Sequence, residues 1–291
     1  MLNENVILAQ NAMIKKTTAA ILYETNSDLV IENLNLAAPG PKEVFVQMGA
    51  AGVCHSDVHV ISGQAQQLMP CVLGHEGAGL VAAIGDEVSR VSVGDHVILS
   101  WLPYCENCYQ CIRGKTHLCK AFQTPVSNGT LLDGSCRFSN KQGPIRQLGS
   151  LGCWSENVVV SEVCCVPVNK SIPFEIAALL GCAVTTGVGA VLNRAKVQKG
   201  ETVVVIGAGG VGLSVVMAAK LKGASQVICI DQNISARNLA IELGATDFLV
   251  SKQNEDISEK LMELTGVGAD HVFEAVGKRE LQSDAIDYCC S

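Results

Sequence analysis

Four cysteines in one short stretch constrain this chain most: Cys105, Cys108, Cys111 and Cys119 follow the spacing C-x2-C-x2-C-x7-C. Four thiolates so close in sequence can surround one metal ion as a tetrahedron, and zinc suits such a site because it is borderline-soft and redox-inert. Since protein would fill all four positions, we expect a structural zinc ion that orders a polar, turn-rich loop. An iron–sulfur cluster and a set of disulfides remain alternatives, although the spacing fits neither common ferredoxin pattern.

Composition and charge narrow the class of protein. The chain has 291 residues, enough for two domains, with 48% hydrophobic and 17% charged residues. The net charge of −7 argues against a nucleic-acid or anionic-membrane partner. No apolar run is long enough to span a membrane, and residues 1–16 have no signal-peptide pattern. We therefore expect a cytoplasmic protein whose first 16 residues form an extension.

The chain has fourteen cysteines. In a chain of this length without a signal peptide, metal ligands and buried thiols are a better explanation than a disulfide framework. Those with no ligand spacing are expected to pack as small buried hydrophobic residues: Cys164, Cys165, Cys229, Cys289 and Cys290.

The two halves of the chain differ in residue pattern, which predicts two domains, 17–185 and 186–291. Glycines and short β-branched runs in the first half are typical of a mostly-β domain with long loops. In the second half strands and helices alternate, which indicates an α/β domain with a parallel sheet. The strands are expected at 201–206, 226–230, 247–250 and 271–275, and the helices at 210–222, 235–243 and 257–264.

A glycine-rich turn follows the apolar strand at 201–206 and opens a helix. Its sequence is Gly207-Ala-Gly209-Gly210-Val211-Gly212. Glycines at these positions permit a tight turn, close approach of a pyrophosphate and close packing of helix on strand, and the helix N-terminus favours phosphate. Asp231 ends the next strand, where a carboxylate can bind both ribose hydroxyls and repel a 2′-phosphate, so the motif predicts NAD rather than NADP. A plain glycine turn with a solvated aspartate is the alternative. Arg237 can support an adenosine phosphate or be a surface charge.

Three further segments contain potential metal ligands: Cys54-His55-Ser56-Asp57-Val-His59, Gly74-His75-Glu76, and the distant Cys182. Spacing alone does not bring Cys54, His75 and Cys182 together. However, the chain resembles the zinc-dependent medium-chain alcohol dehydrogenases from about Thr17 to its last residue. The resemblance rests on CHSD, GHEGAG, the four-cysteine lobe, LLGC, GAGGVG and the acid after the second strand, all in family order.

This resemblance implies a GroES-like catalytic domain followed by a Rossmann domain, and two zinc ions per chain. By the resemblance, Cys54, His75 and Cys182 bind the catalytic zinc, Glu76 is the acid beside it, and the four-cysteine lobe is the structural site. Zinc then acts on the alcohol oxygen while hydride passes to NAD. The resemblance also assigns the remaining roles: Ser56 and His59 to the proton relay, Asp57 to orienting His75, His55 to the pyrophosphate, and Trp101 to the substrate pocket. For His59 and Trp101, an exposed loop histidine and simple packing are the alternatives.

The substrate is expected to be a primary alcohol, and Trp101 favours one with an aromatic group or a long chain. The motifs CHSD, GHEGAG and DGSCRF resemble most those of the class that includes glutathione-dependent formaldehyde dehydrogenase. S-(hydroxymethyl)glutathione or a similar thiol adduct is therefore the alternative substrate. Gln123 stands where that class uses an arginine, the loop GQAQQL lacks its acid, and His59 is unlike it. We expect a small-molecule substrate and a homo-oligomer at full length.

Compared with the family, the sequence stops before the last two strands and a return segment. We therefore expect the apolar faces of Val203–Ile206, Val227–Ile230 and Val272–Phe273 to lose cover, and the chain as written to be a poor catalyst. An inactive zinc- and nucleotide-binding fragment is the further alternative.

Overall fold

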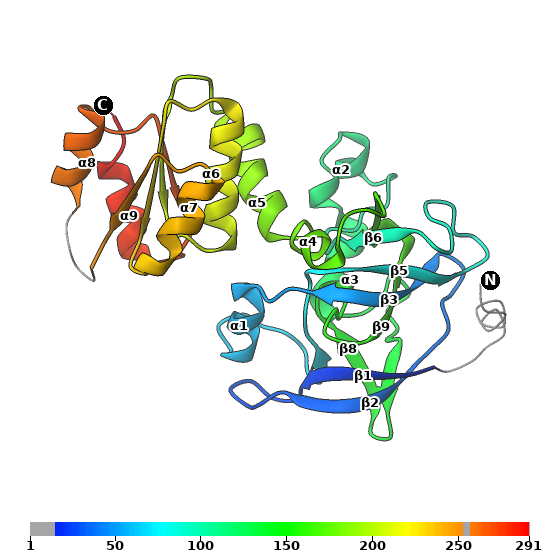
Figure 1. The fold of residues 1–291 in the computed structure, drawn as a ribbon. Coiled ribbons are helices and arrows are strands. Elements are labelled where there is room, and N and C mark those ends of the chain that lie inside the picture. The colour runs from blue at the N-terminus through cyan, green and yellow to red at the C-terminus, as the bar shows by residue number, and fades with distance from the viewer. Residues whose placement is uncertain (1–14, 253–256, 291) are drawn as a thin grey trace. The chain divides into compact units, whose positions relative to one another are not determined.

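The computed structural model describes residues 15–252 and 257–290. The chain divides into two compact units, Met1–Cys182 and Ala183–Ser291, whose arrangement relative to each other is not determined. Figure 1 shows strands dominating the first unit, and strands alternating with helices in the second. The predicted domain boundaries at 17–185 and 186–291 stay predictions. The predicted extension, residues 1–16, lies outside the described residues except for Lys15 and Lys16, which begin the first strand.

The first unit contains a barrel and an antiparallel sheet. Five strands close the barrel in the order β1-β2-β7-β8-β4: β1 (Lys15–Leu22), β2 (Val30–Leu36), β7 (Phe138–Asn140), β8 (Gly143–Gln147) and β4 (Cys71–Val72). The sheet has the order β10-β6-β5-β3-β9: β10 (Cys165–Val168), β6 (His96–Leu99), β5 (Gly77–Ile84), β3 (Glu43–Ala51) and β9 (Asn157–Ser161). One continuous core of buried apolar side chains joins these strands, with Phe138, Leu34 and Val97 inaccessible to solvent.

Short helices connect the strands of the first unit. They are α1 (His55–Ile61), α2 (Tyr109–Ile112), α3 (Lys120–Asn128) and α4 (Phe174–Leu179), with 3-10 turns η2 (Thr116–Leu118), η3 (Leu148–Ser150) and η4 (Glu162–Cys164). Helix α4 packs on β3, β5 and β6 through a small apolar cluster that includes Ala177, Ala178 and Ile98. The ring of Phe174 fills the space where a side chain at Gly49 of β3 would stand, so helix and sheet lie unusually close.

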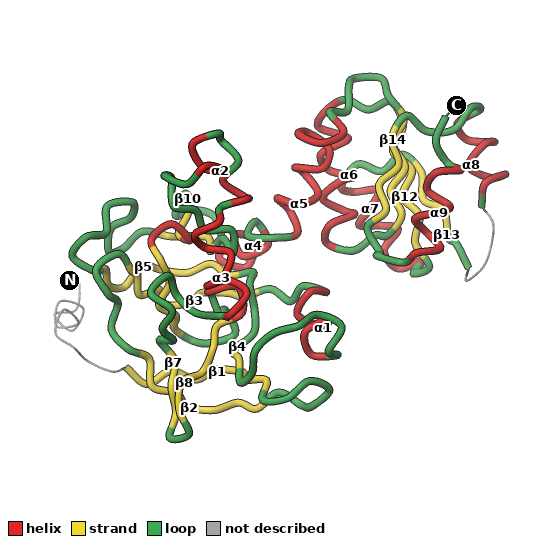
Figure 2. Tube along the Cα trace, turned by 180° about the vertical axis from the view of Figure 1, so that it is seen from behind, coloured by secondary structure: helices red, strands yellow, loops and turns green. Residues whose placement is uncertain are grey.

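The second unit is a parallel four-stranded sheet between two layers of helices, as Figure 2 shows. The strand order is β13-β12-β11-β14: β13 (Asp247–Val250), β12 (Gln226–Asp231), β11 (Thr202–Ile206) and β14 (His271–Glu274). The helices are α5 (Ala183–Gly189), α6 (Gly210–Lys222), α7 (Arg237–Leu243), α8 (Ser258–Thr265) and α9 (Arg279–Asp287), with a π-helical segment η5 (Ala190–Ala195) and a 3-10 turn η6 (Ile234–Ala236).

Side chains of β11 alternate between the two faces of this sheet. Val203 and Val205 pack with α6, whereas Val204 and Ile206 pack with α8 and α9. Parallel strands covered on both faces read as continuous apolar runs, which explains the pattern seen in the sequence.

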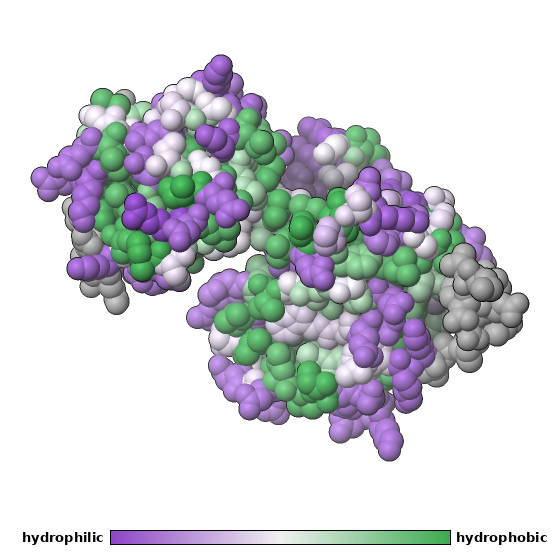
Figure 3. All heavy atoms as spheres, in the orientation of Figure 1, coloured by the Kyte–Doolittle hydropathy of each residue, from purple (hydrophilic) through white to green (hydrophobic). Residues whose placement is uncertain are grey.

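Two expectations about exposure are corrected. Residues Val203–Ile206 and Val227–Ile230 are buried rather than uncovered, because helices lie on both faces, whereas Val272 and Phe273 of the edge strand β14 are half-buried. Cys289 and Cys290 are exposed, unlike Cys164, Cys165 and Cys229, because they follow α9 at the surface. Figure 3 shows polar and apolar residues intermingled over the visible surface. Among the described residues, no helix is long and apolar enough to cross a membrane.

Candidate functional site

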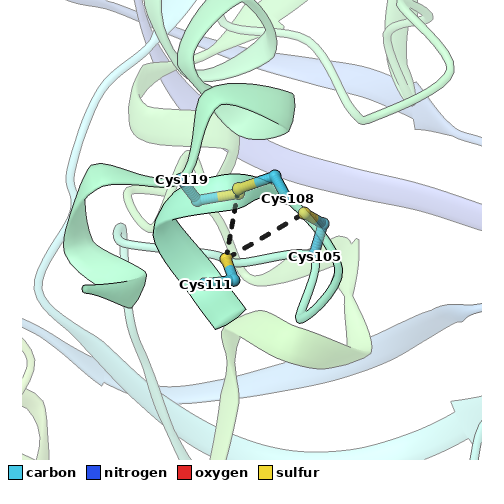
Figure 4. A group of neighbouring side chains, drawn as sticks. All are labelled: Cys105, Cys108, Cys111 and Cys119. Carbon is cyan, nitrogen blue, oxygen red and sulfur yellow. Dashed lines mark hydrogen bonds between the residues drawn. The ribbon is translucent and has the colours of Figure 1, made fainter. Parts of the chain in front are cut away.

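The four predicted ligands of the lobe come together in the structure. The sulfur atoms of Cys105, Cys108, Cys111 and Cys119 all lie within 4.8 Å of one another, and Figure 4 shows them converging. The Cys108 and Cys111 sulfurs are 3.5 Å apart, and those of Cys105 and Cys111 are 4.0 Å apart. None of the fourteen cysteines, all of which lie in the described residues, forms a disulfide. The spacing of the sulfurs suits four thiolates around a zinc ion, for which each bond is about 2.3 Å long.

The lobe also favours the thiolate form at some of its cysteines. Backbone hydrogen bonds, led by that of Cys111, lower the pKa of the Cys108 thiol to about 6. Burial raises the pKa of Cys111 to about 11. At neutral pH the lobe therefore holds both thiolate and thiol, and a metal ion that binds all four as thiolates must release protons.

Arg90, in the loop between β5 and β6, attaches the lobe to the antiparallel sheet. Its guanidinium donates to the Tyr104 hydroxyl at 3.0 Å, lies over the Tyr104 ring and forms an ion pair with Glu106. Tyr104 and Glu106 flank Cys105, and Glu106 has a left-handed backbone conformation (φ 64°). Sequence analysis did not single out Arg90, since no motif marks it.

A second ligand set forms from three distant segments. The ligand atoms of Cys54, His75 and Cys182 lie within 4.8 Å of one another. Strands β3 and β5 bring the first two together, because the register pairs Ala51 with Gly77. The backbone N–H of Gly52 continues this pairing by donating to the Glu76 carbonyl at 2.9 Å. Cys182 follows α4, which packs on the same two strands.

Asp57 holds both ligand-bearing loops in place. This fully buried carboxylate accepts from the backbone N–H of Cys54 at 3.0 Å and from that of Gly74 at 3.1 Å. Its Oδ1 atom is also 3.1 Å from Nδ1 of His75, the hydrogen bond that was predicted. With Nδ1 engaged, the other ring nitrogen, Nε2, is left to bind a metal ion.

The pKa values of the three-ligand set are strongly coupled. Hydrogen bonds from Cys182 and then His75 lower the pKa of the Cys54 thiol to about 3. Burial lowers the pKa of His75, but hydrogen bonds to Asp57 and Cys54 outweigh it and raise the value to about 10. Without metal, the set is therefore a thiolate beside an imidazolium. A metal ion would replace the proton on His75, since only neutral imidazole binds a metal.

Other predicted residues lie around this set. The Ser56 hydroxyl is 3.5 Å from the Cys54 sulfur. Glu76 is buried, with its carboxylate against Gly52. His55 and His59 contact each other edge to face on α1. Ser56 and His59 lie three positions apart on α1, and no hydrogen bond joins them within the part of the chain that the structure describes, so their roles in a proton relay stay predictions.

Two tryptophans border the set. The Trp101 ring lies 6.3 Å from that of His75 and lines a cavity of about 330 Å³. The remaining lining is largely apolar and includes Leu102, Phe122, Gln123 and Val126. Trp154, which sequence analysis missed, donates its indole N–H to the Gly52 carbonyl at 2.9 Å and packs on Gly74. Only the fold reveals this role, because no motif surrounds Trp154.

In the second unit the glycine turn has the predicted strand–turn–helix context. Gly207 adopts φ 102°, and a Cβ atom at Gly212 would stand 1.8 Å from the Gly207 carbonyl oxygen, so helix and strand pack as closely as the motif requires. Nothing lies within 4 Å of a Cβ at Gly209, which leaves the space that a pyrophosphate would fill. Gly210 and Val211 are the first residues of α6.

Asp231 lies at the end of β12, beside the glycine turn. Its Oδ2 accepts from the Ala208 N–H and its Oδ1 from the Asn233 N–H, both at 2.7 Å. These two bonds fix the carboxylate, whose remaining lone pairs are available to ribose hydroxyls. Arg237 is exposed at the start of α7. The fixed Asp231 carboxylate and the open space at Gly209 both fit a dinucleotide.

Comparison with known proteins places the chain in a family. Residues 40–170 match the family described as alcohol dehydrogenase GroES-like domain, and residues 210–290 match that described as zinc-binding dehydrogenase. The S-(hydroxymethyl)glutathione dehydrogenase of Saccharomyces cerevisiae is 42% identical over 94% of this chain and 72% of that relative. The enzyme of the same name from Paracoccus denitrificans is 37% identical over 94% of this chain and 75% of the relative.

Similar solved structures indicate the same family as these sequence relatives. Benzyl alcohol dehydrogenase from Acinetobacter calcoaceticus has a TM-score of 0.87 and 33% identity, with 95% of this chain and 75% of that chain covered. An alcohol dehydrogenase zinc-binding domain protein from Burkholderia ambifaria has a TM-score of 0.89 and 34% identity over the same shares. These similarities confirm the predicted fold class, a GroES-like domain followed by a Rossmann domain. The chain belongs to the zinc-dependent alcohol dehydrogenase family.

Proposed function

We propose that this chain interconverts a primary alcohol and its aldehyde by hydride transfer to NAD, with catalytic zinc held by Cys54, His75 and Cys182. The observation that carries the proposal is the convergence of two thiols and one imidazole, with the imidazole oriented by a buried carboxylate. A zinc ion with three protein ligands keeps one position for the substrate oxygen and acts on it as a Lewis acid. A second zinc ion is proposed for the four-cysteine lobe, where it would be structural.

The chain's own residues supply positioning and proton transfer. Asp57 fixes the His75 ring and the Cys54 backbone. The Ser56 hydroxyl, which lies beside the Cys54 sulfur, is proposed to accept the alcohol proton. His59 is proposed to receive that proton from Ser56 through an intervening group and to pass it to solvent. An intervening group is needed because Ser56 and His59 share no direct hydrogen bond in the described chain. Glu76 would act as a buried acid beside the ligand set.

NAD is the proposed nucleotide, held at the turn of Gly207, Gly209 and Gly212. His55 and Arg237 are proposed to contact its phosphates. The fixed carboxylate of Asp231 supports this choice, because it can bind the ribose hydroxyls and repel a 2′-phosphate.

The cofactor proposal is tested by exchanging Asp231 for Ser together with Asn233 for Arg. We expect the ratio of kcat/KM for NAD to that for NADP to fall at least about tenfold, since the repulsion of the phosphate is removed. Binding of the two nucleotides, followed by fluorescence, gives the same comparison without turnover. An unmodified chain that already prefers NADP would contradict the role of Asp231.

Two substrates are supported by different observations. The apolar lining beside Trp101, with Leu102, Phe122 and Val126, favours an alcohol with an apolar group. Against this, the relatives from Saccharomyces cerevisiae and Paracoccus denitrificans are named S-(hydroxymethyl)glutathione dehydrogenase, and Lys120 lines the same cavity, where its ammonium could pair with a carboxylate. We favour the plain alcohol and keep the thiol adduct as the second candidate.

The test compares kcat/KM for benzyl alcohol with that for formaldehyde plus glutathione, using NAD and zinc-loaded protein. We expect the aromatic alcohol to be the better substrate. In the Gln123→Arg variant the preference should move toward the adduct, because a bidentate cation then lines the cavity. A dependence on glutathione in the unmodified chain would establish the second candidate instead, and no turnover with either would support an inactive fragment.

A further inference from the structure

We infer that His55 and His59 form a third metal-binding site, for a divalent transition-metal ion such as Ni²⁺, Cu²⁺ or excess Zn²⁺. Both residues lie on α1, four positions apart, so their side chains leave the same side of the helix. Their ring centroids are 4.7 Å apart and the ring planes are at 85°. Two histidines with this spacing on a helix can bind one metal ion through both imidazoles.

The chemistry of the pair suits borderline metal ions. Imidazole is a ligand for zinc, copper and nickel, and with bonds of about 2.0–2.1 Å two ligating nitrogens stand about 3 Å apart. His55 is exposed and His59 half-buried, so small rotations of the rings can reach that separation. Water would complete the coordination.

This pair differs from the other histidines of the chain. All six lie in the described residues. His75 belongs to the three-ligand set, His96 stacks on Phe174, and His271 bonds Glu201. His117 lies in the four-cysteine lobe with no ring contact to a second histidine there. Only His55 and His59 are thus adjacent imidazoles open to solvent.

The site is expected to be weaker than the two cysteine-containing sets. It offers two ligands instead of three or four, and the nearby carboxylate of Asp57 is buried and already accepts from Cys54, Gly74 and His75. A metal ion would therefore occupy the histidine pair only after both cysteine sets are filled.

A consequence rests on the proposed function. His59 is the proposed proton carrier, and His55 the proposed contact of the pyrophosphate. A metal ion bound to the pair would take one ring nitrogen of each histidine away from these roles. Excess metal should therefore compete with NAD and inhibit turnover.

The experiment titrates zinc-loaded protein with Ni²⁺ and follows the six histidine C2–H signals by proton NMR, since this paramagnetic ion broadens signals of the residues it binds. His55→Asn and His59→Asn assign the pair, and His117→Asn is the matched control at another accessible histidine. We expect the His55 and His59 signals to broaden together, at a Ni²⁺ concentration at least tenfold below that needed for His117. In either pair variant the remaining partner should need at least tenfold more Ni²⁺, whereas His117→Asn should leave the pair unchanged.

The site is refuted if His117 broadens at the same Ni²⁺ concentration as the pair. Thiolate-to-Ni²⁺ absorption appearing before the histidine signals change would also refute it, because the metal would then bind cysteines. A parallel titration with saturating NAD tests the consequence. If more Ni²⁺ is needed to broaden the His55 and His59 signals when NAD is bound, the two ligands compete. If the same Ni²⁺ concentration suffices, the metal site stands but its link to the cofactor is overturned.

Discussion

The four-cysteine lobe and the three-ligand set differ in how they are built, although in each set the ligand atoms lie within 4.8 Å of one another. All ligands of the lobe come from one segment between Cys105 and Cys119, whereas the other set draws on three segments far apart in the sequence. The lobe has a small apolar cluster of its own around Phe122. The three-ligand set instead rests on the register of β3 and β5 and on buried Asp57. Loss of metal should therefore unfold the lobe but leave the scaffold of the other set standing.

The largest expected effect is on the lobe. Cys108→Ser should remove one zinc ion and lower the melting temperature by at least about 10 °C, because a structural metal site contributes its binding energy to the fold. Metal analysis and thermal unfolding measure this. Cys290→Ser, at an exposed cysteine outside both sets, is the control. A variant that keeps the melting temperature while losing zinc would show that the lobe is ordered without metal.

At the other set the pattern should reverse. Cys182→Ser should lower kcat/KM at least about 100-fold while the melting temperature changes by less than about 3 °C, since strands and helices there do not need the metal. Steady-state assays and thermal unfolding, run beside Cys108→Ser, give the comparison. Equal destabilisation of the two variants would end the distinction between a structural and a catalytic centre.

Asp57→Asn tests whether the buried carboxylate organises the three-ligand set. The amide keeps the shape but loses the charge that orients His75, so zinc affinity at this set should fall about 10–100-fold. Competition with a chelator measures the affinity, and the lobe, which Asp57 does not touch, should keep its zinc. Asp86→Asn at an exposed aspartate is the control. Unchanged affinity would leave Asp57 with a purely structural role.

The smallest effect, taken per pH unit, is that of pH on zinc affinity. Below a pKa of about 10, His75 carries a proton in the metal-free protein, and zinc must displace it. Lower pH therefore favours the metal-free form, and zinc affinity at this set should rise about tenfold per pH unit for each displaced proton between pH 6.5 and 8.5. Calorimetry in two buffers of different ionisation enthalpy counts the protons. Binding without proton release would mean that His75 is already neutral.

Sequence patterns predicted much of the fold because they depend on local periodicity. Helix α6 was expected at 210–222 and begins and ends there, since Gly209 precedes it and Gly223 adopts a left-handed conformation after it. Predictions of burial were less accurate. Cys289 and Cys290 are exposed although cysteine is usually buried, because burial depends on which elements pack against a segment.

By itself the sequence determined those features whose parts are neighbours along the chain: the four-cysteine lobe, the glycine turn with Asp231, and the alternation of strands and helices. Tertiary structure decided the rest. The pairing of Ala51 with Gly77 and the packing of α4 bring Cys54, His75 and Cys182 together, and resemblance to a family had been needed to name them. The threefold bonding of Asp57 and the support from Trp154 became visible only with the fold. The physical reason is that a short loop limits how far apart its ligands can be, whereas distant residues meet only where strand register and helix packing put them.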